Sequence, residues 1–326
     1  MQITEQQSSV VRRPSSIVIG TRGSKLALVQ SEMVQQMLLT AHPGLDVRLE
    51  VIKTRGDVVL DRPLSAFGDK GLFVAEIEDA LRSGRVDLGV HSAKDLPSAL
   101  PPDMAMPFFP ERADPRDVLV ARDGVTTLMN LPQGARVGTS SLRRACQLRN
   151  LRSDMELVDI RGNVDTRLRK LDAGEYDAIV LAAAGLKRLG LAERVTEWLE
   201  PTVMLPATAQ GALGIEVRAG DDAIISLLQP LDHPPTCFAV TAERALLERV
   251  QGGCQVPVGA HAVVDGNTLH LIGMIGDRAG RMVRGARSGP IDRAAELGVA
   301  LADELLANGG QQLLEQETAK TPRAQS

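Results

Sequence analysis

Apolar positions along the chain come in short runs that alternate with segments of helical period. A strand is predicted at 16–20, followed by a helix at 24–40, a strand at 46–54, a helix at 71–83 and a strand at 86–91. This strand–helix–strand order is typical of a parallel sheet whose strands are joined by helical crossovers. The first part of the chain is therefore predicted to be an α/β domain.

A proline-rich stretch at 100–115 interrupts this order and is interpreted as a linker. A second α/β series follows it. Its predicted strands are 117–121, 135–138, 156–160 and 177–182, and its predicted helices are 142–151 and 164–173. The stretch Ala184-Gly185-Leu186-Lys187 is interpreted as a turn, and further boundaries are expected near 201–211 and 231–235.

The last part of the chain has a different pattern. Its predicted strands are 260–264, 268–275 and 281–286, and its predicted helices are 239–250 and 293–307. Asp265-Gly266-Asn267, between the first two of these strands, is a hairpin signal. The pattern indicates a small antiparallel α+β domain. The polar ends of the chain, 1–15 and 315–326, are predicted to be frayed tails.

Composition adds limits rather than a new picture. A length of 326 residues suggests two or three domains, and a hydrophobic fraction of 44% is that of an ordinary globular protein. The net charge of −4 gives no support to a nucleic-acid partner. Aromatic residues make up only 2% of the chain, which argues against a platform for stacking bases.

The three cysteines, Cys146, Cys237 and Cys254, are far apart and form no CxxC pair. Neither a disulfide framework nor a metal site is favoured, and no metal is expected. The N-terminus lacks the apolar region of a secretion signal. No run approaches the roughly 18 apolar residues needed to span a bilayer. We therefore expect a cytoplasmic protein with reduced thiols and no membrane contact.

Basic and hydroxyl side chains gather directly after several predicted strands. Thr139-Ser140-Ser141-Leu142-Arg143-Arg144 follows one strand and opens a helix. Free backbone N–H groups, hydroxyls and two guanidinium groups in such a place favour an anion. The other basic strand ends are Arg161-Gly162-Asn163, Arg167 about one turn further on, Arg188, and Arg22 with Ser24 in the first series.

Open α/β sheets bind ligands outside the carboxyl ends of their strands, so these groups are predicted to line one cleft. One such turn is as readily plain surface charge, but several with the same chemistry favour an anion site. Carboxylates and phosphates both fit. Gly20-Thr21-Arg22-Gly23-Ser24-Lys25 has the wrong spacing for a Walker loop, and the absence of a GxGxxG motif disfavours NAD.

Two further motifs carry candidate chemistry. His91-Ser92-Ala93-Lys94-Asp95-Leu96-Pro97 follows a buried strand, and its carboxylate can serve proton transfer or cation stabilisation, although alone it would be an ordinary loop ion pair. In Gln251-Gly252-Gly253-Cys254-Gln255-Val256-Pro257 two glycines leave the Cys254 thiol unshielded. Its alternative is a tight turn that happens to contain cysteine. A cysteine hydrolase is weakened because no histidine has a suggestive context.

Together these motifs resemble the porphobilinogen deaminase family, from about Ile17 to the C-terminal helix. The motifs that carry the resemblance are Thr54-Arg55-Gly56-Asp57, Gly71-Leu72-Phe73, His91-Ser92-Ala93-Lys94-Asp95, Val137-Gly138-Thr139-Ser140-Ser141-Leu142-Arg143-Arg144, Arg161-Gly162-Asn163-Val164 and Gly252-Gly253-Cys254-Gln255-Val256-Pro257. The resemblance implies a transferase that joins four porphobilinogen molecules head to tail, with release of ammonia, to give hydroxymethylbilane, the linear precursor of haem and chlorophyll. It also implies a dipyrromethane cofactor held by a thioether to Cys254.

The same resemblance implies a role for each matching residue. Asp95 would be the catalytic carboxylate, which binds pyrrole N–H groups and stabilises positive charge as ammonia leaves. The residues implied to hold the cofactor are Cys254 (covalently), Ser92, Lys94, Asp95, Thr139, Ser141, Arg143 and Arg144. The residues implied to bind the carboxylate-rich substrate are Arg22, Ser24, Arg161, Arg167, Arg188, Phe73 and Lys70. Ala66 lies where bacterial relatives can carry a lysine, so one basic contact would be missing.

The implied fold is α/β, with two periplasmic-binding-protein-like α/β domains joined by two crossovers and a small C-terminal α+β domain with a three-stranded antiparallel sheet. The implied domains are 16–110 with 212–230, then 111–211, then 231–314, between tails at 1–15 and 315–326. The strand pattern alone does not show that residues 212–230 return to the first domain. The alternative function is a non-catalytic two-lobed binding or sensor protein for a small polycarboxylate, against which Lys94, Asp95 and Cys254 count. We expect a monomer.

Overall fold

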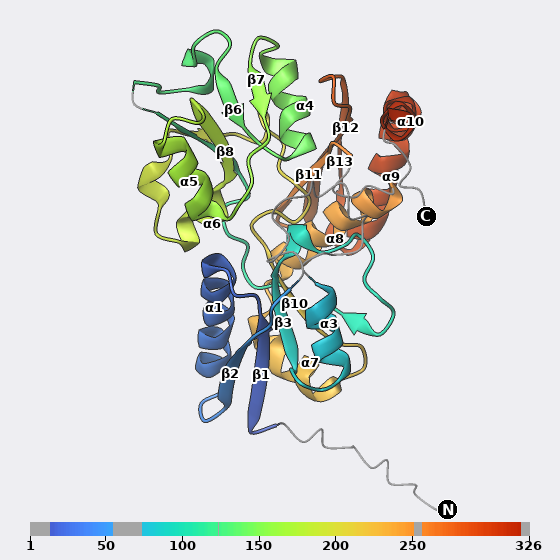
Figure 1. Cartoon of the computed structure of the whole chain (residues 1–326). Helices are drawn as coiled ribbons and strands as arrows, with labels where there is room; N and C mark the ends of the chain where they lie inside the picture. The colour runs from blue at the N-terminus through green and yellow to red at the C-terminus, as the bar shows by residue number, and fades with distance from the viewer. Residues whose placement is uncertain (1–13, 55–73, 123, 251–255, 321–326) are drawn as a thin grey trace, which may run out of the picture.

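Three sheets organise the part of the chain that the computed structural model describes, residues 14–54, 74–122, 124–250 and 256–320. Two of these sheets have five strands each and the third has three. Figure 1 shows the first sheet below, the second above it, and the third beside them. This arrangement confirms the predicted fold class of two α/β units with a small antiparallel α+β unit.

The first sheet has the strand order β2-β1-β3-β10-β4. Its strands are β1 (Ser16–Thr21), β2 (Asp46–Val51), β3 (Leu88–Ser92), β4 (Met104–Ala105) and β10 (Leu213–Arg218), and its helices are α1 (Lys25–Ala41), α3 (Ala75–Arg82) and α7 (Asp222–Leu228). β1 runs parallel to β2 and β3, whereas β10 is antiparallel to β3 and β4. The predicted parallel arrangement of the first three strands is therefore confirmed, and the chain then re-enters this sheet from the opposite direction at β10.

The second sheet has the order β7-β6-β8-β5-β9. Its strands are β5 (Asp117–Ala121), β6 (Arg136–Gly138), β7 (Glu156–Val158), β8 (Ala178–Ala182) and β9 (Glu197–Leu199), and its helices are α4 (Leu142–Leu151), α5 (Val164–Asp172) and α6 (Ala183–Arg188). β5 is antiparallel to both β8 and β9, so this sheet is mixed as well. The predicted turn at 184–187 is wrong. Gly185 lies inside α6, where it faces Leu26 of α1.

The third sheet is the predicted antiparallel one. It consists of β11 (Val258–Asp265), β12 (Thr268–Gly276) and β13 (Met282–Pro290), and its helices are α8 (Pro234–Arg249), α9 (Ala294–Leu305) and α10 (Gln311–Lys320). Gly266 has φ +54° in the turn between β11 and β12, which confirms the predicted hairpin. The frayed tail predicted from 315 is wrong up to Lys320, because α10 continues that far.

Each sheet is covered by helices that present apolar positions to it. In the first sheet, Ile17 and Ile19 of β1 are buried together with Val34 and Leu38, which stand one turn apart on α1. Burying one such side chain contributes about 1.5–3 kcal/mol. Within the described residues, no helix is long and apolar enough to cross a membrane.

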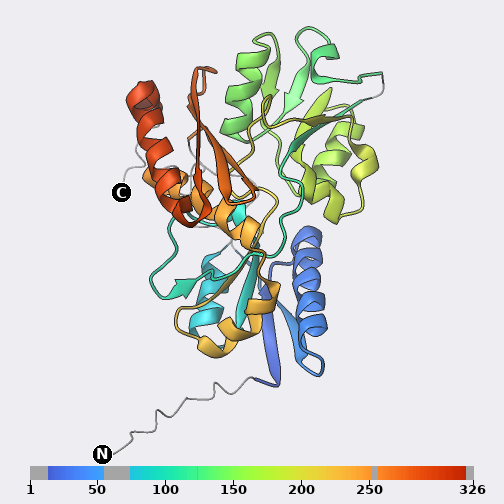
Figure 2. The same ribbon diagram turned by 180° about the vertical axis from the view of Figure 1, so that it is seen from behind.

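The chain crosses between the first two sheets twice, at 106–116 and at 200–212, and we call these stretches the first and second crossing segments. The third unit holds both. Helix α8 lies in the middle of the molecule, between the three sheets (Figures 1 and 2). Its Glu243 is fully buried and accepts hydrogen bonds from Arg112 Nη1 at 2.6 Å and from the Ala209 amide at 2.6 Å. The Ala262 amide of β11 donates to the same carboxylate at 2.8 Å. One side chain thus fastens both crossing segments to the third sheet.

Candidate functional site

The carboxyl ends of β1, β3 and β8 meet where the two large sheets face each other. Helix α1 begins directly after β1, and its first turn lies beside α6, which follows β8 (Figure 1). A Cβ added to Gly185 of α6 would lie 3.7 Å from the Leu26 side chain of α1. Ser24 caps α1 by accepting a hydrogen bond from the Ala27 amide at 3.3 Å. The structure therefore brings the predicted strand-end residues of both sheets to one junction.

The segment after β3 forms a 3-10 turn, Ala93–Asp95, that faces this junction. Ser92 accepts a hydrogen bond from Gln30 Nε2 of α1 at 2.8 Å, which fixes the start of the turn. Lys94 Nζ lies 3.3 Å from Gln210 Oε1, on the second crossing segment. Asp95 is exposed. A carboxylate is thus presented to solvent from a turn that is held at both neighbouring positions.

Burial and neighbouring charges shift the pKa of Lys94. Burial, helped by the nearby Arg144 and Arg143 and opposed by Asp95 and Asp117, lowers the pKa of its ammonium group to about 8. An anion bound beside Lys94 would stabilise the charged form and raise this pKa. The site should therefore bind a carboxylate more tightly below this pKa, where the ammonium is charged, than above it.

Arg143 and Arg144, in the first turn of α4, are almost fully buried and share one carboxylate, that of Asp117 in β5. Each guanidinium lies 2.7 Å from one oxygen of Asp117, and Gln210 Nε2 donates to the same carboxylate at 2.9 Å. Burial opposes ionisation of Asp117, but the attraction of Arg143 and Arg144 outweighs it and holds the pKa well below its usual range.

Among the residues that the structure describes, this cluster carries more positive than negative charge. Two guanidinium groups and the Lys94 ammonium stand against the single buried carboxylate of Asp117. Arg143 Nε is buried and makes no hydrogen bond to any residue that the structure describes. A buried donor without an acceptor is costly, so the cluster fits an anionic group. The carboxylates of a dipyrromethane have that chemistry.

Thr139 and Ser141 shape the approach to this cluster. The Thr139 hydroxyl accepts from the Ser141 amide at 3.2 Å, and Ser141 caps α4 by accepting from the Arg144 amide at 3.5 Å. Both hydroxyls therefore lie at the positive end of α4, as the sequence predicts.

The second group of basic residues, Arg167 and Arg188, binds backbone carbonyls instead of a carboxylate. Arg167 Nε donates to the Gly162 carbonyl at 2.8 Å, and Arg188 Nη2 donates to the Gly211 carbonyl at 2.7 Å. Burial lowers the pKa of each of these two guanidinium groups to about 10. For Arg167, Arg144 and Arg161 contribute to this lowering of the pKa whereas Asp95 opposes it, which places Arg167 within electrostatic reach of the Asp95 turn.

Arg188 Nε is buried and makes no hydrogen bond to the described part of the chain. Arg161 pairs loosely with Asp159, at 3.5 Å. Gly162 has φ +108°, and a Cβ there would come within 2.6 Å of Thr166. This backbone conformation favours glycine, which explains the glycine between Arg161 and Asn163, the N-cap of α5.

The structure does not test every predicted site residue. Cys254, Phe73 and Lys70, like Ala66, lie outside the described residues. Sequence reasoning also missed three residues that hold the site together: Asp117, Gln210 and Gln30. Asp117 had a signal, a lone acidic residue in the apolar run of β5. Gln210 and Gln30 had none, because their roles depend on tertiary contacts.

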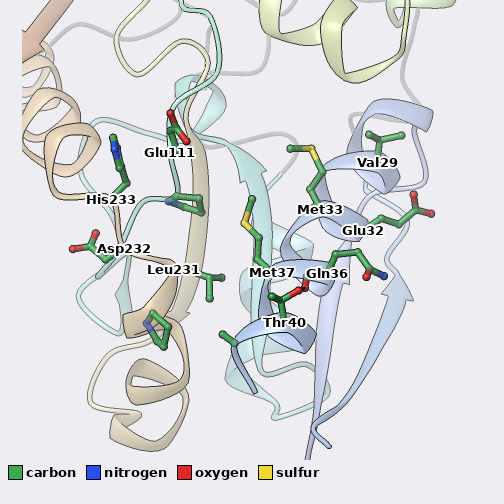
Figure 3. A pocket seen from close by; sticks show the side chains of 13 residues that line it. Val29, Glu32, Met33, Gln36, Met37, Thr40, Glu111, Leu231, Asp232 and His233 are labelled. Atoms are coloured by element: carbon green, nitrogen blue, oxygen red, sulfur yellow. Dashed lines mark hydrogen bonds between the residues drawn. The ribbon is translucent and has the colours of Figure 1, made fainter. Parts of the chain in front are cut away.

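A groove of about 960 Å³ lies elsewhere, along α1. Figure 3 shows Met33 and Met37 of α1 across this groove from Leu231, Asp232 and His233. No lysine or arginine lines it. A ligand rich in carboxylates would find no counter-charge there, so the groove is not the candidate site.

Fold and site define the class: a two-lobed α/β protein with a cationic junction between its lobes and a third α+β unit. The model of "Porphobilinogen deaminase, dipyromethane cofactor binding domain" matches residues 17–226, and that of "Porphobilinogen deaminase, C-terminal domain" matches 237–307. The chain therefore belongs to the porphobilinogen deaminase family.

Relatives called porphobilinogen deaminase span nearly the whole chain. The one from Roseiflexus castenholzii is 66% identical over 92% of this chain and 99% of its own, and the one from Roseiflexus sp. (strain RS-1) is 64% identical over 92% and 98%. Among solved structures, the aliphatic sulphonate binding protein SsuA from Escherichia coli is 19% identical, with a TM-score of 0.39 over 73% of this chain and 71% of that one. That likeness is too distant to indicate a ligand. The family does not favour the alternative of a non-catalytic binding protein.

Proposed function

We propose that the junction around Asp95 joins porphobilinogen units head to tail with release of ammonia, to give hydroxymethylbilane. The observation that carries this proposal is the surplus of buried guanidinium groups over carboxylates beside an exposed carboxylate. Each substrate unit brings an acetate and a propionate group. A growing chain of such units therefore supplies the anions that the buried donors lack.

Asp95 is the proposed catalytic residue. It lies at the end of a turn that Ser92 and Lys94 hold in place, and its carboxylate is open to the junction. There it accepts hydrogen bonds from pyrrole N–H groups and stabilises the positive charge that develops as ammonia leaves. Arg167, which is electrostatically coupled to Asp95, binds a substrate carboxylate beside it.

The dipyrromethane, when bound through the proposed thioether to Cys254, supplies the pyrrole end to which the first substrate unit is joined. Lys94, Arg143 and Arg144 bind its carboxylates, and Ser92, Thr139 and Ser141 supply hydroxyl groups around them. Arg22, Ser24, Arg161 and Arg188 are proposed to bind substrate carboxylates, together with Phe73 and Lys70.

Replacing Asp95 tests the catalytic role. Asp95→Ala should reduce kcat by at least about 10²–10³-fold, because a group that stabilises charge in the transition state is lost. Its melting temperature should stay unchanged, since the Asp95 side chain is exposed. The matched control is Asp103→Ala, which removes an exposed carboxylate, just before β4, that is paired with Arg82 of α3. Near-normal turnover in Asp95→Ala would remove Asp95 from the mechanism.

An intact mass spectrum tests the cofactor. The protein should exceed its sequence mass by two linked pyrrole units, mapped to a peptide that contains Cys254. Cys254→Ser should lack the added mass, whereas Cys237→Ser, which changes a half-buried thiol of α8, should keep it. A fully active protein of unmodified mass would contradict the proposed attachment.

The remaining proposals concern the whole protein. We propose a cytoplasmic monomer that does not bind nucleic acid, with domains at 16–110 with 212–230, at 111–211 and at 231–314. Cys146 and Cys237 carry free thiols, which supports a reducing compartment. The entry of β10 into the first sheet supports the return of 212–230 to the first domain.

A further inference from the structure

Helix α8 of the third unit reaches the turn that carries Asp95. Arg244 Nη2 donates to the carbonyl oxygens of Pro97 at 2.8 Å and of Ser98 at 2.9 Å. These carbonyls lie two and three positions after Asp95. The guanidinium therefore crosses from one structural unit to another and holds the exit of the Asp95 turn.

The backbone carbonyls that Arg244 binds have no other donor among the described backbone N–H groups. Residues 96–100 belong to no helix or strand, and Pro97 has no N–H group to donate. Beyond buried Leu96, whose amide donates to the Ala93 carbonyl, two charge-assisted hydrogen bonds from one half-buried guanidinium thus hold this backbone at residues 97 and 98.

Arg244 is itself held in a defined place. Burial lowers the pKa of its guanidinium group, and the attraction of Glu248 and of the fully buried Glu216 opposes that shift. Glu216 is on β10, next to the strand that leads to Asp95, and pairs with His91 of that strand at 3.2 Å. The charges around Arg244 therefore come from both units that it joins.

The same helix leads toward the proposed cofactor attachment. α8 ends at Arg249, five positions before Cys254. One residue before Arg244, Glu243 binds both crossing segments. A short stretch of α8 is therefore connected to the crossing segments, to the Asp95 turn and, along the chain, to Cys254.

We propose that Arg244 is a positioning residue, which fixes the place of the Asp95 carboxylate at the junction by tying residues 97 and 98 to α8. This inference rests on the catalytic role proposed for Asp95. A misplacement of about 1 Å in a reacting group can cost roughly 100-fold in rate. Arg244 acts through the backbone of the turn and not through contact with the substrate.

Arg244→Met in the full-length protein removes the donors and keeps the apolar stem. We expect kcat to fall about tenfold with little change in KM, because substrate binding is unaffected while alignment is lost. Arg244→Lys should recover part of kcat, since an ammonium can still donate to either carbonyl. The matched control is Arg249→Met, on the same helix, whose guanidinium pairs with exposed Asp303 and should leave kcat unchanged.

A second readout does not depend on activity. Hydrogen exchange of the peptide that covers residues 92–100 should speed up in Arg244→Met and not in Arg249→Met, with or without cofactor. Intact mass should show that Arg244→Met still carries its two pyrrole units. If Asp95→Ala kept its turnover but this exchange pattern held, the role of Asp95 would fail while the tie between α8 and the turn would stand.

Three results would overturn the inference: unchanged kcat and exchange in Arg244→Met, a loss of kcat that only follows a loss of folded or cofactor-loaded protein, or no difference between the methionine and lysine variants. If Arg244→Met does not fold, Arg244→Lys alone decides. Its hydrogen exchange at residues 92–100 must then lie above that of the unchanged protein.

Discussion

The two groups of arginines at the junction differ in what neutralises them. Arg143 and Arg144 share the buried carboxylate of Asp117, at 2.7 Å each. Arg167 and Arg188 bind backbone carbonyls instead, and burial lowers the pKa of each to about 10. Both groups are basic and inward, but within the described part of the chain only the first is bound to a carboxylate.

This difference suggests that the two groups of arginines bind different ligands. A guanidinium fixed by a carboxylate keeps one geometry, which suits a group that remains bound through every turnover. A guanidinium that is bound to neutral carbonyls is not neutralised by them, so it can pair with a ligand carboxylate. Such a guanidinium suits substrate carboxylates that bind and are released. The first group would thus hold the cofactor, and the second would bind successive units of the growing chain.

Removing Asp117 should have the largest effect. Asp117→Ala leaves Arg143 and Arg144 buried without their carboxylate, which should lower the free energy of unfolding by about 3–5 kcal/mol. Asp159→Ala is the matched control, because Asp159 is 65% exposed and only loosely paired with Arg161, so its loss should cost under about 1 kcal/mol. Urea unfolding of both variants measures the difference, and equal losses would contradict the comparison.

The next test exchanges one arginine from each group for leucine. Arg143→Leu should be isolated without the mass of two pyrrole units, because a cofactor contact is gone. Arg188→Leu should keep that mass, but its kcat/KM should fall about 10–100-fold, as expected for the loss of a hydrogen bond to a charged group. Intact mass and steady-state kinetics measure the two effects. A cofactor-loaded Arg143→Leu or a cofactor-free Arg188→Leu would reverse the assignment.

A smaller effect concerns pH. Since burial lowers the pKa of Lys94 to about 8, its ammonium loses its charge as pH rises through that value. The rate of cofactor assembly by cofactor-free protein should therefore fall severalfold between about pH 7 and about pH 9. Lys94→Met should assemble the cofactor slowly, with no such step. An identical pH profile in both proteins would exclude Lys94 as its source.

The stability change has a defined sign. The pKa of Lys94 is lower in the folded than in the unfolded chain, so the charged form is disfavoured by folding. The cost is therefore full below about pH 8 and disappears as pH rises toward the unfolded value of about 10.4. Without cofactor, Lys94→Met should be stabilised relative to the unchanged protein at neutral pH, and less so at high pH.

Local sequence patterns predicted the parts of the fold that local forces determine. The strand and helix at Asp117–Ala121 and Leu142–Leu151 were predicted at their observed bounds, because an apolar run and a serine cap are visible in the chain. Strand β10 was missed, since its antiparallel place beside β3 depends on a crossing that no local pattern encodes. Helix α6 was predicted as a turn, whereas Gly185 lies inside the helix with Leu26 of α1 beside it, a tertiary neighbour that the local pattern does not show.

The candidate site divides in the same way. Arg143, Arg167 and Arg188 could be found because their positions after strands are written in the sequence. What each arginine binds could not be found, since Asp117 and the carbonyls of Gly162 and Gly211 reach them only through tertiary packing. The distinction between a neutralised and an uncompensated guanidinium is therefore a property of the folded chain.

The buried contacts of Glu243 also set an order for biosynthesis. Arg112 leaves the ribosome 131 positions before the carboxylate that neutralises it. At about 5–20 residues per second, Arg112 waits roughly 7–26 seconds before Glu243 is made. Until then neither crossing segment has its anchor. The lobes can acquire their mutual orientation only late in translation, after most of the protein has already been synthesised.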